Sequence, residues 1–219
     1  MNAASSTRPR LPARLILACL GLAAGIGLGF LVGRLIKTGV LAIDRLTWSD
    51  HGATVIAAIF VGLGLIVAVA SVSPKLAGRL LDPDGERAAT PAQASLYRMQ
   101  ALVTVLAGAM LGAPVIVALA FNPLPMPVAS VAMLAIVAAF LLQTACNLML
   151  WRRGDELMRR VMAETGAVCF WILQGLLFLW AAAAKLELAP AVSSWDLITV
   201  LMGFYLLVSS AMSMRRGLA

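Results

Sequence analysis

The charged side chains that could do chemistry gather in residues 150–165, LWRRGDELMRRVMAET. This stretch holds four arginines and three carboxylates, in a chain of which only 12% is charged. Paired carboxylates at a membrane surface could serve acid–base chemistry on a lipid. Neighbouring arginines account for them instead, because the carboxylates lie four residues from arginines, the spacing of ion pairs along a helix. The expected pairs are Asp155–Arg159, Glu156–Arg160 and Arg160–Glu164.

These charges predict an elbow between two helices at the membrane surface. Gly154 is expected to end one helix, and Asp155 to cap the next, where its charge suits a helix N-terminus. Arginines flank the elbow and are expected to meet lipid phosphates, while Trp151 fits the aromatic belt at the same level. The candidate interfacial motif is therefore Asp155, Glu156, Arg159, Arg160 and Glu164.

Other residues have side chains that could bind a metal ion, but their spacing matches no metal site. His51 with Asp50 and Asp44 could hold a metal, but nothing in the sequence fixes the three together. DPDGE at 82–86 lacks the remaining ligands of a calcium loop and predicts a turn. The three cysteines match no metal pattern and predict apolar packing residues; they are Cys19, Cys146 and Cys169. We therefore expect no catalytic residue, cofactor or metal site.

The composition places all of these residues in a membrane protein. Hydrophobic residues make up 62% of the chain, against about 45–50% in a typical soluble domain. Charged residues avoid the middles of the apolar runs, as a hydrocarbon solvent requires. The net charge of +7 fits cytoplasmic loops. Nucleic-acid binding is not expected, because no stretch is long enough to form a basic folded surface.

Six apolar runs are long enough to cross a bilayer, which takes about 20 residues each. The sequence predicts an all-α, six-helix transmembrane bundle, since a barrel needs an alternation that is absent. Residues 1–14 form a basic tail and 15–219 one transmembrane domain, divided into an extra N-terminal hairpin (15–72) and a four-helix unit (98–219). The predicted spans are 15–35, 53–72, 100–121, 128–150, 163–184 and 193–213.

The loops predict that both termini lie in the cytoplasm. Most Lys and Arg residues fall in the N-terminal tail, in the second and fourth connections and in the C-terminal tail, as the positive-inside bias requires. The first connection is the exception, although two of its basic residues can snorkel from the end of the first helix. The basic residues on that other side are Arg34, Lys37, Arg45 and Lys185.

Helix ends and prolines refine this map. TPAQ at 90–93 predicts a capping box with Pro91 at the first helical position, so the third span should begin in the cytoplasm. NPLPMP at 122–127 cannot continue a helix and predicts a tight outer turn between antiparallel neighbours. Pro114 lies inside a predicted span and should kink it.

Small and polar residues indicate how the helices meet. Small residues let helix backbones approach closely in lipid. A candidate packing groove runs along the first span, consisting of Gly21, Gly25, Gly29 and Gly33. Gly108 and Gly112 repeat this spacing in the third span, and Gly62 and Gly64 mark a close approach in the second. The groove serves either packing within the bundle or the binding of a partner helix or a second copy.

Amides lie inside the spans and have two interpretations. They either form hydrogen bonds between helices or, together with Pro114, line a path for a small solute. No acidic or basic residue accompanies them in the middle of a span, which argues against a proton-coupled pump. The amides are Gln143, Asn147 and Gln174.

The charged stretch also carries a resemblance. GDELMRRVMAETGAVCF, followed by SSWD and a terminal MRR, resembles a family of small bacterial inner-membrane proteins of unknown function. Members have four spans, with a DE-L-x-R-R-(I/V)-x-x-E motif between the second and third. This chain departs by adding two N-terminal spans and by having Thr165-Gly166-Ala167 after the motif. The match covers roughly residues 98–219, with the motif at Asp155, Glu156, Leu157, Arg159, Arg160, Val161 and Glu164.

The sequence therefore predicts a multi-pass protein of the bacterial inner membrane. Its expected role is that of a non-enzymatic accessory or scaffold acting through helix contacts. Its expected partners are a bilayer with anionic headgroups and a transmembrane helix of another protein or a second copy. The alternative is a small transporter or channel for a neutral or lipid-like solute. A lipid-modifying enzyme is the third hypothesis, and only the carboxylates of the charged stretch support it.

Overall fold

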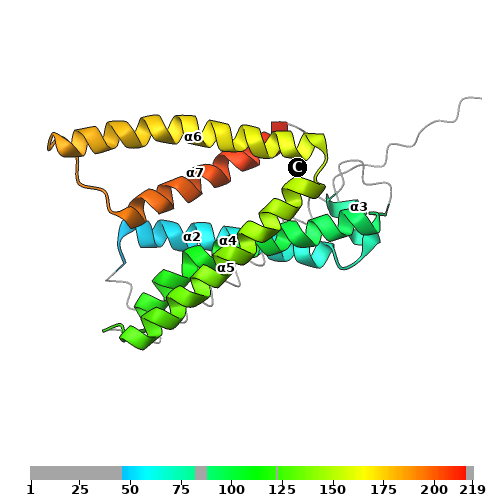
Figure 1. The fold of residues 1–219 in the computed structure, drawn as a ribbon, viewed down its shortest axis with the longest axis horizontal. Coiled ribbons are helices and arrows are strands. Elements are labelled where there is room, and N and C mark those ends of the chain that lie inside the picture. The colour runs from blue at the N-terminus through cyan, green and yellow to red at the C-terminus, as the bar shows by residue number, and fades with distance from the viewer. Residues whose placement is uncertain (1–45, 82–87, 122, 216–219) are drawn as a thin grey trace, which may run out of the picture.

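The computed structural model describes residues 46–81, 88–121 and 123–215, and these ranges contain helices and connections but no strand (Figure 1). Five of the helices are long and apolar enough to cross a membrane. The helices are α2 (Trp48–Ala70), α3 (Pro74–Leu81), α4 (Pro91–Ala120), α5 (Met126–Arg153), α6 (Glu156–Lys185) and α7 (Ser194–Arg215). Each of the five long helices contains most of one predicted span, although α4 and α6 begin nine and seven residues before the predicted starts. The first predicted span lies outside the described residues.

Reciprocal hydrogen bonds fix where three of the long helices begin. At α4, the backbone N–H of Gln93 donates to the Thr90 hydroxyl (3.2 Å) and that of Thr90 to the Gln93 side chain (2.8 Å), which confirms the predicted capping box. Two further boxes were not predicted. Thr47 and Asp50 form one before α2, and Ser193 and Asp196 form the other before α7. Each box satisfies backbone donors that a helix start leaves unpaired.

α2 is the element on which the other helices are assembled. It packs along α4 on one side and along α7 on another, while α5 packs on α4 and α6 on α7. The long helices alternate in direction along the chain from α4 to α7, so α2 and α7 run parallel to each other (Figure 1). The result is two helix pairs, α4–α5 and α6–α7, held together through α2.

The contact between α2 and α4 is made by small residues. A Cβ atom added at Gly64 would lie 2.6 Å from Val105 Cγ2 and 2.9 Å from the carbonyl oxygen of Ala101. One added at Gly108 would lie 2.6 Å from the carbonyl oxygen of Ala57. The helices therefore touch backbone to backbone, as glycine allows. The predicted close approach is confirmed at Gly64 and Gly108, but Gly62 has no neighbouring atom within 4 Å.

The core lies on the same side of α2, near the start of that helix. Ala53 and Ala57 are buried against Leu111 and Val115 of α4. Trp195 of α7 packs against this cluster, which joins the third helix to the contact. Nearby, the Thr199 hydroxyl donates to the carbonyl oxygen of Ser49 (3.4 Å) and ties the start of α7 to that of α2.

The proline-rich segment forms the expected turn. α4 ends at Ala120 and α5 begins at Met126, so the connection occupies 121–125 and Pro127 falls within the first helical turn of α5. α4 and α5 are antiparallel neighbours, as predicted. Pro114 lies inside α4, which continues as one helix on both sides of it.

The short helix α3 was not predicted, because its surroundings read as a charged loop. Its sequence, PKLAGRLL, repeats its basic residues at a spacing of four positions and some of its leucines likewise, which is the sequence pattern of an amphipathic helix. Ala77 is fully buried, and α3 contacts both α2 and α4.

Candidate functional site

The charged elbow between α5 and α6 is built by a glycine and a capping carboxylate. The N–H of Gly154 donates to the carbonyl oxygen of Leu150 (2.7 Å), which ends α5. A Cβ atom at Gly154 would lie 2.8 Å from that same oxygen, so the position favours glycine on steric grounds. Asp155 Oδ1 then accepts from the backbone N–H of Met158 (2.7 Å), which confirms Asp155 as the cap of α6.

The predicted ion pairs form only in part. Arg160 Nε lies 2.9 Å from Glu164 Oε1, as expected. Asp155 is used by the cap instead of by Arg159, whose Nε donates to the carbonyl oxygen of Gly154 (3.0 Å). No ion pair joins Glu156 to Arg160. The elbow is thus held by backbone groups, and much of its arginine charge faces outward.

Basic side chains of the described ranges gather at one end of the helices. This end holds the elbow, α3, the start of α4 and the end of α7, while the other end carries Lys185 (Figure 1). This end therefore carries exposed guanidinium groups, together with the exposed side chains of Trp151 and Leu157. The basic residues at the first end are Lys75, Arg98, Arg152, Arg153, Arg159, Arg160 and Arg215.

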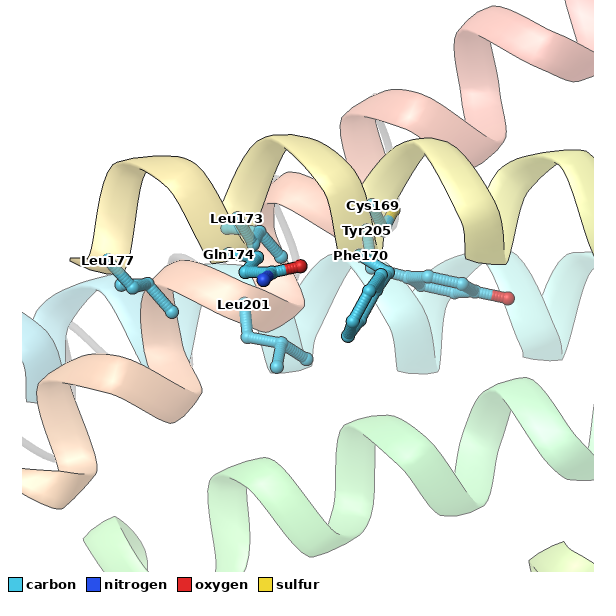
Figure 2. Close-up of a pocket in the computed structure, with 7 residues that line it drawn as sticks. All are labelled: Cys169, Phe170, Leu173, Gln174, Leu177, Leu201 and Tyr205. Atoms are coloured by element: carbon cyan, nitrogen blue, oxygen red, sulfur yellow. The ribbon is translucent and has the colours of Figure 1, made fainter. Parts of the chain in front are cut away.

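A second candidate site is an apolar groove between α6 and α7. Its volume is about 400 Å³, and the close-up in Figure 2 shows its side chains converging from both helices. The sequence did not predict it, because it depends on how two helices with large side chains meet. The lining residues are Cys169, Phe170, Leu173, Gln174, Leu177, Leu201 and Tyr205.

Gln174 is the amide of this groove and has no partner in the described part of the chain. It lies just past the middle of α6, and its side chain points into the groove (Figure 2). Gln143, by contrast, donates from Nε2 to the backbone carbonyl oxygen of Val103 on α4 (3.3 Å). These two glutamines therefore differ, since Gln143 joins helices of this chain and Gln174 has no partner among the described residues.

The structure does not gather the remaining candidates for a solute path around these two. Asn147 lies on α5 with Gln143, and Pro114 is on α4. Gln174 belongs to the other helix pair, and α6 packs on α7 instead of on α4 or α5. Among the described helices, the amides of α5 therefore belong to the α4–α5 pair and Gln174 belongs to the α6–α7 pair.

Open backbone adjoins Gln174. No neighbouring atom of the described segments lies within 4 Å of the position that a Cβ would take at Gly175, the next residue along α6. At Gly64 and Gly108 a partner helix fills this space. Trp171 and Phe178, on the same face of α6 as Gln174, are 76% and 70% exposed. This face combines bare backbone, an unpaired amide and two large rings.

The candidates for metal chemistry have other roles or lie outside the described residues. Asp50 accepts hydrogen bonds from Thr47 at the start of α2, and Asp44 and the segment 82–86 are not described. Within the described ranges, no three His, Cys, Asp or Glu side chains form a group able to hold a metal ion. Cys146 and Cys169 are buried thiols, and Cys19 and the glycine groove at 21–33 are not described.

Comparison of the chain with protein-family models, with curated proteins and with solved structures found no match. The resemblance of residues 98–219 to a four-span bacterial family therefore stays a prediction.

Proposed function

We propose that this chain is a non-enzymatic accessory or scaffold of the bacterial inner membrane, which binds another transmembrane helix. The observation that carries the proposal is the unpaired amide of Gln174 in an apolar groove. In hydrocarbon, an amide without a hydrogen bond costs several kcal/mol, because no water can pair with it. Acyl chains offer no donor or acceptor, whereas a second helix offers both.

The pairing of Gln143 supports this choice of partner. That amide already donates to a backbone carbonyl of a neighbouring helix, so the same chain uses a glutamine in this way once. Gln174 has the same side chain, lies within a predicted span, and is an exposed residue that lines the groove. A helix that approaches the groove would give its backbone or side chain to this amide, at roughly 0.6–2 kcal/mol for the hydrogen bond.

Purification from native membranes in mild detergent, after cross-linking, tests the proposal. The wild-type chain should retain a stoichiometric helical partner, and Gln174→Leu should lose it. Gln143→Leu is the matched control, because it removes an amide that is already paired within the chain. Retention of the partner by Gln174→Leu, or a wild-type chain that purifies alone, would contradict the proposal.

The proposed orientation has six crossings, with both termini and the arginine-rich elbow in the cytoplasm. The gathering of described basic residues at one end of the helices supports it, because cytoplasmic loops retain Lys and Arg. Outward-facing arginines at the elbow would then meet anionic headgroups. Reporter fusions after residue 219 and within 150–155 should report the cytoplasm, and a fusion within 123–125 the opposite side. A periplasmic elbow would reverse the map.

Transport of a neutral, lipid-like solute is the second candidate. The same groove favours it, since a space of about 400 Å³ with one amide could hold a small amphipathic molecule. Flux into liposomes that falls with Gln174→Leu and not with Gln143→Leu would support transport. Equal flux through the wild-type protein and both variants would exclude the groove at Gln174 as the path of the solute.

A further inference from the structure

We propose that the helix docking on α6 is the α6 of a second copy, with the two Gln174 side chains hydrogen-bonded to each other on the two-fold axis. This inference rests on the proposed function and names its partner. It begins from the chemistry of the amide. A glutamine side chain carries a carbonyl oxygen that accepts and an NH₂ group that donates, so two of them satisfy each other reciprocally.

Membrane insertion fixes the symmetry of such a pair. Copies of one chain insert with the same orientation, so the two-fold axis of a dimer runs along the membrane normal. Equivalent residues then lie at equal depth. The two α6 helices run parallel, and Gln174 can face only a partner group near the middle of the bilayer. The second copy supplies such a group at that depth, namely its own Gln174.

The shape of α6 around Gln174 allows this approach. Gly175 leaves the backbone bare and has no neighbour within 4 Å, although glycines at the α2–α4 contact are filled by the facing helix. Trp171 and Phe178 lie one turn to either side of Gln174 on the same face and are largely exposed. A helix crossing at Gly175 would therefore bring the two amides together and cover both rings.

Among the described helices, the groove beside Gln174 stays open. Leu201 and Tyr205 of α7 line it together with α6 side chains, and the space between them is about 400 Å³. A side chain of the second copy could enter this space. The interface would then combine a polar centre with an apolar surround.

The dimer fraction in mild detergent, measured on the full chain by native mass spectrometry, tests the inference. The wild-type chain should be dimeric. Gln174→Leu should raise the dissociation constant roughly threefold to thirtyfold for each hydrogen bond lost. Gly175→Leu should also weaken the dimer, because its side chain would hold the helices apart. Gly62→Leu is the control, since it adds the same side chain at an open position on α2.

Disulfide cross-linking in native membranes provides a second readout that leaves Gln174 intact. In a background with Cys19, Cys146 and Cys169 replaced by alanine, Trp171→Cys and Phe178→Cys should form covalent dimers on oxidation. Val131→Cys, which is 68% exposed on α5, should not. A monomeric wild-type chain, or a dimer insensitive to both Gln174→Leu and Gly175→Leu, would overturn the inference.

The two proposals fail in different ways. A monomer that retains a different protein, and loses it with Gln174→Leu, would refute the second copy and leave the proposed function standing. A chain with neither a second copy nor another helix would refute both.

Discussion

Where α2 meets α4, glycine and alanine make the closest approaches, whereas α6 and α7 face each other with leucine, phenylalanine and tyrosine. The first pair closes completely, with backbone atoms against backbone atoms. The second pair leaves a groove with an amide in it. In lipid, helices associate by fit and hydrogen bonds, because there is no hydrophobic gain in leaving a solvent as apolar as leucine. Small residues thus produce the close contact between α2 and α4. The large residues of α6 and α7 leave a groove that a further helix or a small molecule could occupy.

The largest expected effect comes from adding a side chain to the closed pair. Gly108→Leu would place its Cβ 2.6 Å from the carbonyl oxygen of Ala57 and 2.8 Å from Val61 Cγ2, and a backbone atom cannot move aside as a side chain can. We expect a loss of about 3 kcal/mol or more, the upper range for overpacking. Unfolding in mixed detergent micelles measures it. Gly62→Leu, at an open position, should lose little.

Removing a side chain from the open pair should matter less. Leu173 is 5% exposed between α6 and α7. Leu173→Ala should cost about 1–2 kcal/mol, below the roughly 2–5 kcal/mol of soluble cores, because acyl chains can enter the adjacent groove and no transfer from water is lost. The same unfolding assay measures it. If Leu173→Ala lowered the free energy of unfolding as much as Gly108→Leu does, the α6–α7 contact would be as closely packed as the α2–α4 contact, which contradicts the comparison.

The connection between the pairs depends on one cap. Asp155→Ala removes the side chain that accepts from the N–H of Met158, and we expect a loss of about 1 kcal/mol, typical of a helix N-cap. Asp155→Asn should retain most of the stability, because an amide oxygen caps almost as well. Hydrogen exchange at the backbone N–H of Met158 measures local unfolding at the elbow. Faster exchange in Asp155→Ala than in Asp155→Asn would show that the effect comes from the lost cap and not from the lost charge.

The two glutamines within the spans are expected to give the smallest effects. Gln143→Leu removes one hydrogen bond to the carbonyl oxygen of Val103, which still accepts within its own helix, so the loss should be about 0.6 kcal/mol. Gln174→Leu should cost less still, because Gln174 has no hydrogen bond to any residue that the structure describes. A larger cost at 174 than at 143 would mean that Gln174 is paired within the chain.

Helix identity and ends could be read from the sequence because they depend on local chemistry. Apolar runs, the box at Thr90 and Gln93, the cap at Asp155 and the turn after Ala120 all follow from neighbouring residues. The boxes at Thr47 and Ser193 carried the same local signal, a hydroxyl residue three positions before an aspartate, and were overlooked.

Tertiary features could not be read in this way. Charge spacing predicted three ion pairs at the elbow, but the cap competes for Asp155 and a backbone carbonyl for Arg159. Likewise, Gln143 and Gln174 are equivalent in sequence, and only the packing of α5 on α4 and of α6 on α7 separates them. The groove exists because of how α6 and α7 meet, which no single-segment pattern encodes.

The bond between Thr199 and Ser49 joins residues 150 positions apart. At about 5–20 residues per second, a ribosome needs roughly 8–30 s to make the chain between them. During that interval the start of α2 has been synthesised, while its contact on α7 has not. The face that α7 later covers must meanwhile be sheltered by lipid or by an insertion factor, so the last helix to emerge completes the surroundings of the first described one.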